Sequence, residues 1–262
     1  MDSETKGPIP AAADPKAAEH DEAAWGYSSP YEPRWPATLT ILAALVLYYT
    51  LPERLTPGPN WVVPALELAV IVPLNISAPR ITPSRLRREI AIVLFGAISV
   101  ANFIALVLLI QELLGKIAPA GHQQLEGRTL IVAAIHIWLT NVIIFGLWYW
   151  EPDRGGPIER RKPRHGHPDF LFPQMTVPES APHWTPGLVD YLYVSLTNAT
   201  AFSPTDTPPL TPTAKALMLT QSLVSLLTIA LVAARAVNIL SQGHLVLGGL
   251  VMRASAALGW AA

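Results

Sequence analysis

The sequence predicts an all-α, polytopic integral membrane protein with about five transmembrane helices. Of its 262 residues, 51% are apolar and 14% are charged, whereas about 25% of residues are charged in an average soluble domain. A helix needs about 20 apolar residues to cross the hydrocarbon core of a bilayer, and several uncharged runs reach that length. The chain has no cysteine and a formal net charge of −1, which argues against disulfide scaffolds, thiolate metal sites and nucleic-acid binding.

Residues 1–34 are expected to form a disordered tail, because they hold seven acids, three bases and repeated Ala and Pro. Residues 35–150 are expected to form a four-helix transmembrane region, and a fifth span follows a polar connection. Aromatic residues lie at the ends of these runs, where membrane interfaces favour them. The predicted spans are Trp35–Leu51, Trp61–Pro79, Ile90–Ile110, Thr129–Trp150 and Ala216–Ala234.

The connection over residues 151–184 is rich in Pro, Arg and His, and it is too interrupted by proline to form a domain of its own. It is expected to be a long polar loop. Its run of charged residues, 159–164, is interpreted as a cluster that fixes membrane orientation and contacts anionic lipid. Residues 241–262 contain an apolar run too short to span, so they are expected to form an interfacial tail.

The distribution of Lys and Arg predicts the orientation, because cytoplasmic loops retain them. Three bases lie in the first 34 residues, four in 80–88 and five in 151–184, but one and two in the loops between. The N-terminus and the long loop are therefore expected in the cytoplasm, with the protein in the inner membrane of a bacterium. The first span would serve as the signal anchor.

The segment before the last span divides into two pieces. Residues 190–202 have the pattern of a helix of about 13 residues, half the length of a crossing. Residues 203–213 are rich in Pro and Thr, which prevents a helix beyond Ser203. A half-length helix, extended polar backbone and then a full span is the layout of a re-entrant pore loop, so residues 185–240 are treated as one pore-loop-like unit.

This unit resembles the pore region of tetrameric potassium-channel-like cation channels, which consists of a pore helix, a T-x-G-Y-G-D filter, a proline and threonine, and an inner helix. Residues 200–206, TAFSPTD, lie over the filter, and Pro209 and Thr211 follow. The chain is also similar to uncharacterised bacterial multi-span proteins with the terminal pattern D-[YF]-L-Y-x-S-x-T-x-x-T-A-F-x-x-x-D, which matches residues 190–206. The channel resemblance implies a pore helix containing Thr197 and a homotetramer.

The filter departs from the potassium pattern at three positions. Ser203 and Thr205 occupy the glycine places, where a positive φ aims backbone carbonyls inward, and Pro204 fixes φ near −65°. A potassium-type carbonyl ladder is therefore not expected. What remains is a wider mouth lined by the hydroxyls of Thr200, Ser203 and Thr205, with a ring of Asp206 that attracts inorganic cations weakly and with little selectivity.

The predicted orientation conflicts with this pore, because four crossings before the loop place its mouth in the cytoplasm rather than outside. Either the charge count misleads, or the second run does not span, or the segment is a surface cap. The sequence leaves two interpretations open: a re-entrant pore loop, and a capping or interfacial hairpin.

Polar residues recur along one face of the last helix at spacings of four and three. This stripe must face either protein or water, so it is either a set of hydrogen bonds between helices or a conduction wall. Arg235 at its end is expected to reach the interface or to pair there. The stripe consists of Gln221, Ser225, Thr228, Val232 and Arg235.

Further polar residues fall inside the predicted spans. An ionisable residue at depth is a candidate for function: Glu67 is either a shallow paired acid or a proton or cation site, and His136 is either a bonded packing residue or part of a proton relay. The set comprises Glu67, Asn75, Asn102, His136 and Asn141.

No catalytic set stands out, and no cofactor is predicted. His165, His167 and Asp169, with His183 further on, have a weak metal-site pattern, and solvated side chains are expected instead. The leading hypothesis is an oligomeric, channel-like protein that passes cations near residues 200–206. The alternatives are a non-conducting membrane scaffold or sensor, and third a small secondary transporter with a midplane cavity near Glu67 or His136.

Overall fold

The structure is a computed structural model in which every described element is helical. No strand occurs in the described parts of the chain, which agrees with the all-α prediction. The structure describes residues 35–65, 68, 84–114, 125–157, 160, 167–177, 184–201 and 206–257. Within these ranges, only the backbone is described at residues 84–87, 201 and 238–257.

Three helices are long and apolar enough to cross a membrane: α5 (Ser84–Leu113), α6 (Gly127–Trp150) and the first part of α9 (Pro212–Ala257). The protein is therefore membrane-embedded by length and composition. The count of five spans is not established. Helix α2 (Trp35–Tyr49) has 15 residues, and most of the predicted second span, including Glu67 and Asn75, lies outside the described residues.

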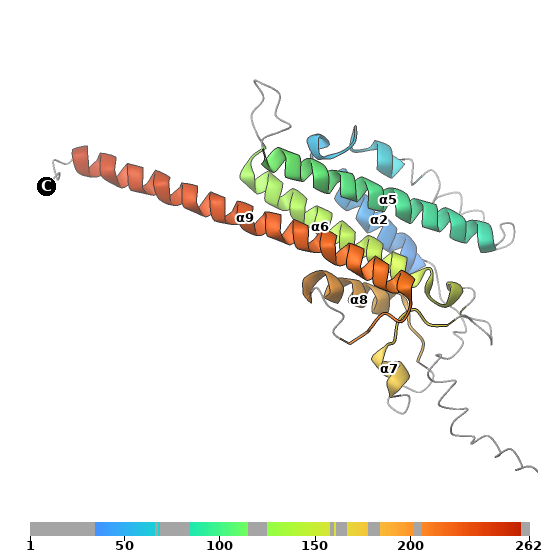
Figure 1. Ribbon diagram of the computed structural model, residues 1–262. Coiled ribbons are helices and arrows are strands. Elements are labelled where there is room, and N and C mark those ends of the chain that lie inside the picture. The colour runs from blue at the N-terminus through green and yellow to red at the C-terminus, as the bar shows by residue number, and fades with distance from the viewer. Residues whose placement is uncertain are drawn as a thin grey trace, which may run out of the picture.

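Helices α2, α5 and α9 run in one direction and α6 runs against them (Figure 1). One buried cluster contains Ile41 of α2, Phe95 of α5 and Leu147 of α6. A second cluster lies nearer the C-terminal ends of α2 and α5 and the N-terminal end of α6. It contains Leu106 of α5 and Ile137 of α6. We call the end where α6 finishes and α9 begins the proximal end, and the opposite one the distal end.

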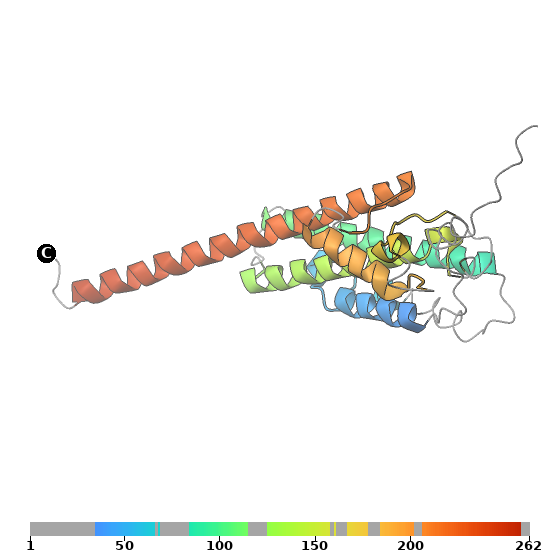
Figure 2. The same ribbon diagram turned by 90° about the horizontal axis from the view of Figure 1, so that it is seen from below.

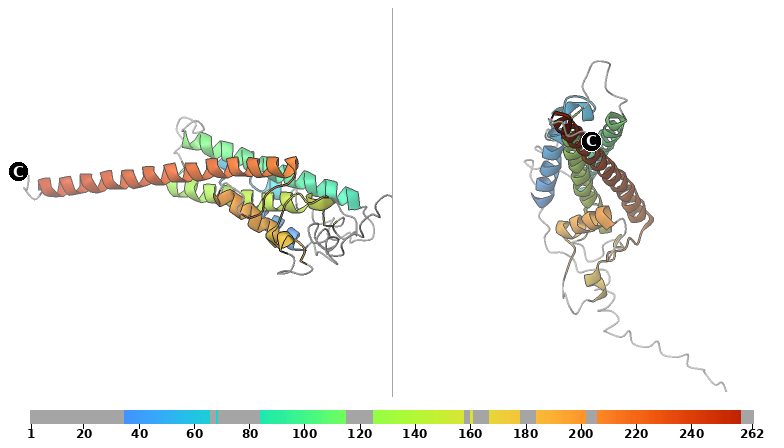
Figure 3. Two further views of the ribbon diagram at one scale, coloured as in Figure 1. Left: turned by 60° about the horizontal axis from the view of Figure 1, so that its bottom comes forward. Right: turned by 90° about the vertical axis from the view of Figure 1, so that its left-hand side faces the viewer.

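Helix α8 (Leu188–Ala201) is 14 residues long, about 21 Å at 1.5 Å per residue. It begins at the proximal end and packs against α6 and α9 (Figures 1 and 3). It contributes Leu188, Tyr191 and Val194 to the proximal buried cluster, while α9 begins again at the proximal end. Helix α8 thus has about the half-crossing length predicted for residues 190–202 and begins two residues earlier than expected, whereas residues 203–205 of the predicted return lie outside the described residues.

The connection after α6 is packed rather than solvated. It contains the 3₁₀ turn η2 (Asp153–Gly155) and the short helix α7 (Pro173–Thr176). Phe170, Phe172 and Met175 lie in the proximal buried cluster. The connection can pack in this way because apolar side chains stand between its prolines. The interpretation of residues 159–164 as a lipid-contacting charge cluster needs correction at Arg160, which is 3% exposed.

Helix α9 continues without interruption to Ala257, although its span was expected to end near Ala234 and to be followed by a separate tail. Residues 213–257 contain no proline, and each interior glycine costs only about 1 kcal/mol relative to alanine. The glycines at 243, 248 and 249 therefore weaken the helix without ending it. Figure 2 shows this helix extending far beyond the other helices.

Gly146 allows α8 to lie close to α6. An added Cβ would meet Leu192 Cδ2 at 2.6 Å and Leu192 Cα at 3.2 Å. We expect Gly146→Ala to push α8 away and to lower the free energy of unfolding by about 1–3 kcal/mol, as overpacking does. Thermal unfolding in detergent micelles, followed by circular dichroism, measures the change.

Gly96→Ala in α5 is the matched control, because no described atom lies within 4 Å of its added Cβ. Alanine is the better helix former, so this variant should be at least as stable as the native chain. Equal losses in both variants would contradict the close approach of α6 and α8.

Candidate functional site

Gln221 lies at the centre of a buried polar cluster that joins α6, α8 and α9. Its Oε1 accepts hydrogen bonds from Tyr149 Oη at 2.5 Å and Asn198 Nδ2 at 2.8 Å. Its Nε2 donates to the Ser195 carbonyl oxygen at 2.9 Å and to Ser195 Oγ at 2.6 Å. The amide thus uses both acceptor sites and both donors, and Gln221 is 0% exposed.

The same cluster extends toward both neighbours of α8. Asn198 Nδ2 donates to the Met218 carbonyl at 3.0 Å, and Ser195 Oγ donates to the Val142 carbonyl at 2.6 Å. Asn141 Nδ2 donates to Ser225 Oγ at 2.9 Å. We use the term polar cluster for Asn141, Tyr149, Ser195, Asn198, Gln221 and Ser225.

The polar cluster lies near the middle of the apolar spans of α6 and α9. Asn141 precedes the end of α6 by nine residues, and Gln221 follows the start of α9 by nine, which is about 14 Å along each helix. The hydrocarbon core of a bilayer is about 30 Å thick. Polar groups at this depth need partners within the protein, and the cluster supplies them.

The stripe predicted on α9 faces protein. Gln221, Ser225 and Thr228 are each 0% exposed, and Thr228 Oγ1 donates to the Val224 carbonyl of its own helix at 2.7 Å. Of the two sequence interpretations, hydrogen bonding between helices fits the positions of Gln221 and Ser225. Helices of the same chain cover these three side chains, so they do not form the wall of a conduction path.

The candidate pore residues near the end of α8 bond within their own helix and not to the polar cluster. The hydroxyl of Thr200 donates to the Leu196 carbonyl at 2.9 Å, and that of Thr197 donates to the Tyr193 carbonyl at 2.9 Å. Thr200 and Asp206 are exposed. Ser203, Pro204 and Thr205, the centre of the predicted filter, lie outside the described residues.

A cluster of charged residues at the proximal end was missed by the sequence analysis. Asp153 is 0% exposed and accepts hydrogen bonds from the Tyr191 hydroxyl and from the Asp169 amide at 2.7 Å. Arg154 Nε lies 3.7 Å from Asp153 Oδ2. Arg160 Nη1 donates to the Trp150 carbonyl at 2.7 Å, which caps the C-terminus of α6 with a cation.

The turn at the glycine pair makes this cluster possible. Arg154, Gly155 and Gly156 have φ values of 54°, 83° and 101°, and a Cβ on Gly156 would meet the Glu151 carbonyl oxygen at 2.7 Å. The chain therefore folds back over the end of α6. The two consecutive glycines are a sequence signal that could have indicated this turn, but no pattern in the sequence indicates the buried charges around it.

Asp169 fastens this connection to the segment before α9. Its carbonyl accepts the Leu210 amide at 2.8 Å, and its Oδ1 accepts the Thr211 hydroxyl at 2.5 Å. Burial raises the pKa of Asp169 above its ordinary value, and the nearby Asp153 raises it further. The Thr211 hydrogen bond and, more weakly, Arg154 and Arg88 oppose this shift.

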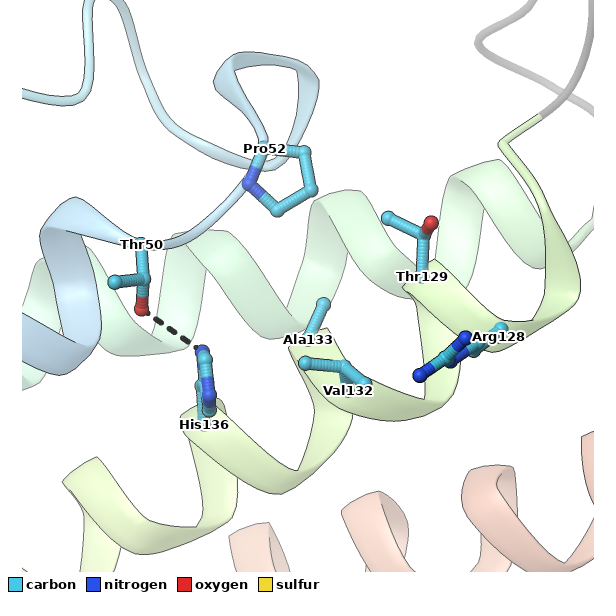
Figure 4. Close-up of a pocket in the computed structure, with 7 residues that line it drawn as sticks. All are labelled: Thr50, Pro52, Arg128, Thr129, Val132, Ala133 and His136. Carbon is cyan, nitrogen blue, oxygen red and sulfur yellow. Dashed lines mark hydrogen bonds between the residues drawn. The ribbon is translucent and has the colours of Figure 1, made fainter.

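His136 lies outside the polar cluster, toward the distal end. Its Nδ1 is 3.0 Å from Thr50 Oγ1, beside an open cavity of about 190 Å³ (Figure 4). In addition to these two residues, Pro52, Arg128, Thr129, Val132 and Ala133 line the cavity.

The remaining candidates are dispersed. Asn102 is 3% exposed in α5, and Arg235 is partly buried on α9. His167 is exposed, whereas His165 and His183 lie outside the described residues. Where the structure describes the chain, no three His, Asp or Glu side chains gather as a metal site.

Comparison with known proteins gave no further assignment. No protein-family model matches this chain, and no significant match was found among curated proteins or solved structures.

Gln221→Leu tests whether the polar cluster stabilises the fold. The substitution removes four hydrogen bonds, and such bonds in a membrane protein average about 0.6 kcal/mol each. We expect the free energy of unfolding in micelles to fall by about 2 kcal/mol. Thr40→Val on α2 is the control, since the Thr40 hydroxyl donates to the Pro36 carbonyl of its own helix; a similar loss there would contradict the assignment.

Asp169 predicts a dependence of stability on pH. A carboxyl whose pKa is raised by folding binds its proton more tightly in the folded state, so its contribution is complete below the unfolded pKa and is lost as pH rises through the folded pKa. Thermal stability should therefore fall as pH increases above about 4, the ordinary Asp value. Asp169→Asn should flatten this part of the profile, and an unchanged profile would remove Asp169 as its source.

Proposed function

We propose that the protein is a homo-oligomeric, channel-like membrane protein that passes cations past the C-terminal end of α8. The observation that supports this proposal is the half-length helix, which begins at the proximal end, stops partway along α6 and is followed by a full span that begins at the same end. Non-helical backbone at membrane depth is tolerated where it is buried in protein or lines water. Pore loops are built on this layout.

The C-terminus of α8 is suited to cations. A helix carries about half a negative charge at its C-terminus, where the last carbonyls lack partners in the helix. Thr200 is exposed on the last turn, and Asp206 is exposed on the return to α9. In the proposed assembly these residues surround a shared axis as a weakly selective mouth. The distribution of basic residues favours the cytoplasmic side of a bacterial inner membrane for that mouth.

A second candidate function is a non-conducting membrane scaffold or sensor. It is favoured by the bonding of α8, because Ser195 and Asn198 find their partners on α6 and α9 of the same chain. The hairpin then needs no neighbouring copy to satisfy these two side chains. In this alternative, residues 190–211 act as a structural cap.

Cation flux into liposomes separates the two functions. We expect the native protein to pass monovalent cations and Asp206→Asn to reduce the flux about tenfold, because the ring of charge that concentrates cations at the mouth is lost. Asp206→Glu should retain most of the flux. Glu53→Gln is the matched control, an exposed acid at the distal end.

Two outcomes would remove the channel. The first is no flux from the native protein in vesicles where its incorporation is verified, and the second is equal flux from the native protein and Asp206→Asn. Particle symmetry adds a separate measurement. A rotationally symmetric oligomer with the α8 segments around one axis supports the proposal, whereas a monomer with α8 at its rim supports the cap.

A further inference from the structure

The face of α9 opposite the polar cluster is uncovered from Thr213 to Val237. Eight of its residues alternate at spacings of three and four, which is a heptad pattern, and all eight are exposed. Five of them, Ala216, Thr220, Leu223, Leu227 and Ala230, lie two residues from a buried position such as Met218 or Gln221, about 200° around the helix. We call this row the free seam: Thr213, Ala216, Thr220, Leu223, Leu227, Ala230, Ala234 and Val237.

The free seam differs in composition from the adjacent exposed row. Five of its eight members are Ala or Thr, and membrane helices favour such small residues for close helix contact. The adjacent row contains Leu219, Leu226 and Ile229, also exposed, which suits contact with lipid chains. Exposure alone therefore does not distinguish the two rows, but over residues 216–230 the free seam has the smaller side chains.

The length of α9 is the independent observation. Its 46 residues extend about 69 Å, more than twice the thickness of a hydrocarbon core. Its C-terminal part continues beyond the other helices (Figures 1 and 2). Residues 238–257 contain three glycines and eleven apolar residues, with His244 and Arg253 as their ionisable residues.

Such a sequence does not form a stable helix by itself in water. Glycines in the interior of a helix disfavour it, short isolated helices are marginal, and a helix that is apolar on all sides needs burial. The heptad of the free seam continues along this extension with Ser241, His244, Gly248, Val251 and Ser255. Small residues thus occupy three successive equivalent positions, 241, 248 and 255.

We infer that the free seam and its extension are the contact surface for α9 of a second copy of this chain, packed in parallel. Copies inserted in one membrane share one orientation, so their α9 helices run side by side in the same direction. A repeat of 3.5 residues keeps the seam at the contact as the helices supercoil left-handedly. The inference deepens the proposed oligomer by naming its contact, but it does not require conduction.

Single-cysteine cross-linking tests this contact, because the chain contains no cysteine of its own. Ala234→Cys places a thiol on the free seam, and Ala233→Cys places one on the neighbouring exposed position at almost the same depth. Gly248→Cys and Gly249→Cys form the equivalent pair in the extension. Each variant is oxidised with copper phenanthroline in native membranes, and dimer is quantified on a non-reducing gel.

We expect Ala234→Cys and Gly248→Cys to give about fivefold more dimer than their neighbours, because a disulfide requires Cα atoms within about 7 Å. Equal cross-linking within each pair, or none at any position, would overturn the inference. Cross-linking at 233 and 249 instead would place the contact on the adjacent row and also overturn it. Seam cross-linking in a protein without cation flux would keep the contact and remove the proposed channel.

Discussion

The arrangement of this protein depends on one constraint: a polar group in the middle of a bilayer must find its partner within the protein. Gln221 meets this constraint for three helices together, because its amide bonds to Tyr149 on α6 and to Ser195 and Asn198 on α8. Ser195 and Asn198 also donate to the Val142 and Met218 carbonyls, so several bonds join the same three helices. The half-length helix is thereby fixed at one depth and one rotation between its neighbours.

Much of the fold was predictable because run length and helix breakers act locally. The uncharged runs gave α5 and α6, and the proline at 204 limited α8 to half a crossing. The packing of residues 151–177 was not predictable in the same way, since Arg160 reaches a carbonyl ten residues earlier and Asp153 bonds to Tyr191. Such contacts depend on where the chain folds back, and periodicity does not encode that.

The candidate site was predictable in part. The spacing of Gln221, Ser225 and Thr228 correctly placed them on one face, but periodicity alone could not decide whether that face meets protein or water. Ser195, which bonds to Gln221, belongs to no repeating pattern in the sequence, because its role depends on the depth at which α8 crosses α6. The extent of α9 was also missed, since Gly248 and Gly249 suggest an end to a helix whose backbone tolerates them.

The two faces of α9 together limit what a pore could be. The polar residues of the helix are used within the chain, and the free seam lies about 200° away from them. A contact along this seam leaves α8 on the other side of α9, because Ser195 and Asn198 bond to Gln221 on the polar face. The α8 segments of two copies joined at the seam would therefore not meet at the seam itself. A path past Thr200 and Asp206 would need a second contact between copies, on the side of α9 where α8 lies.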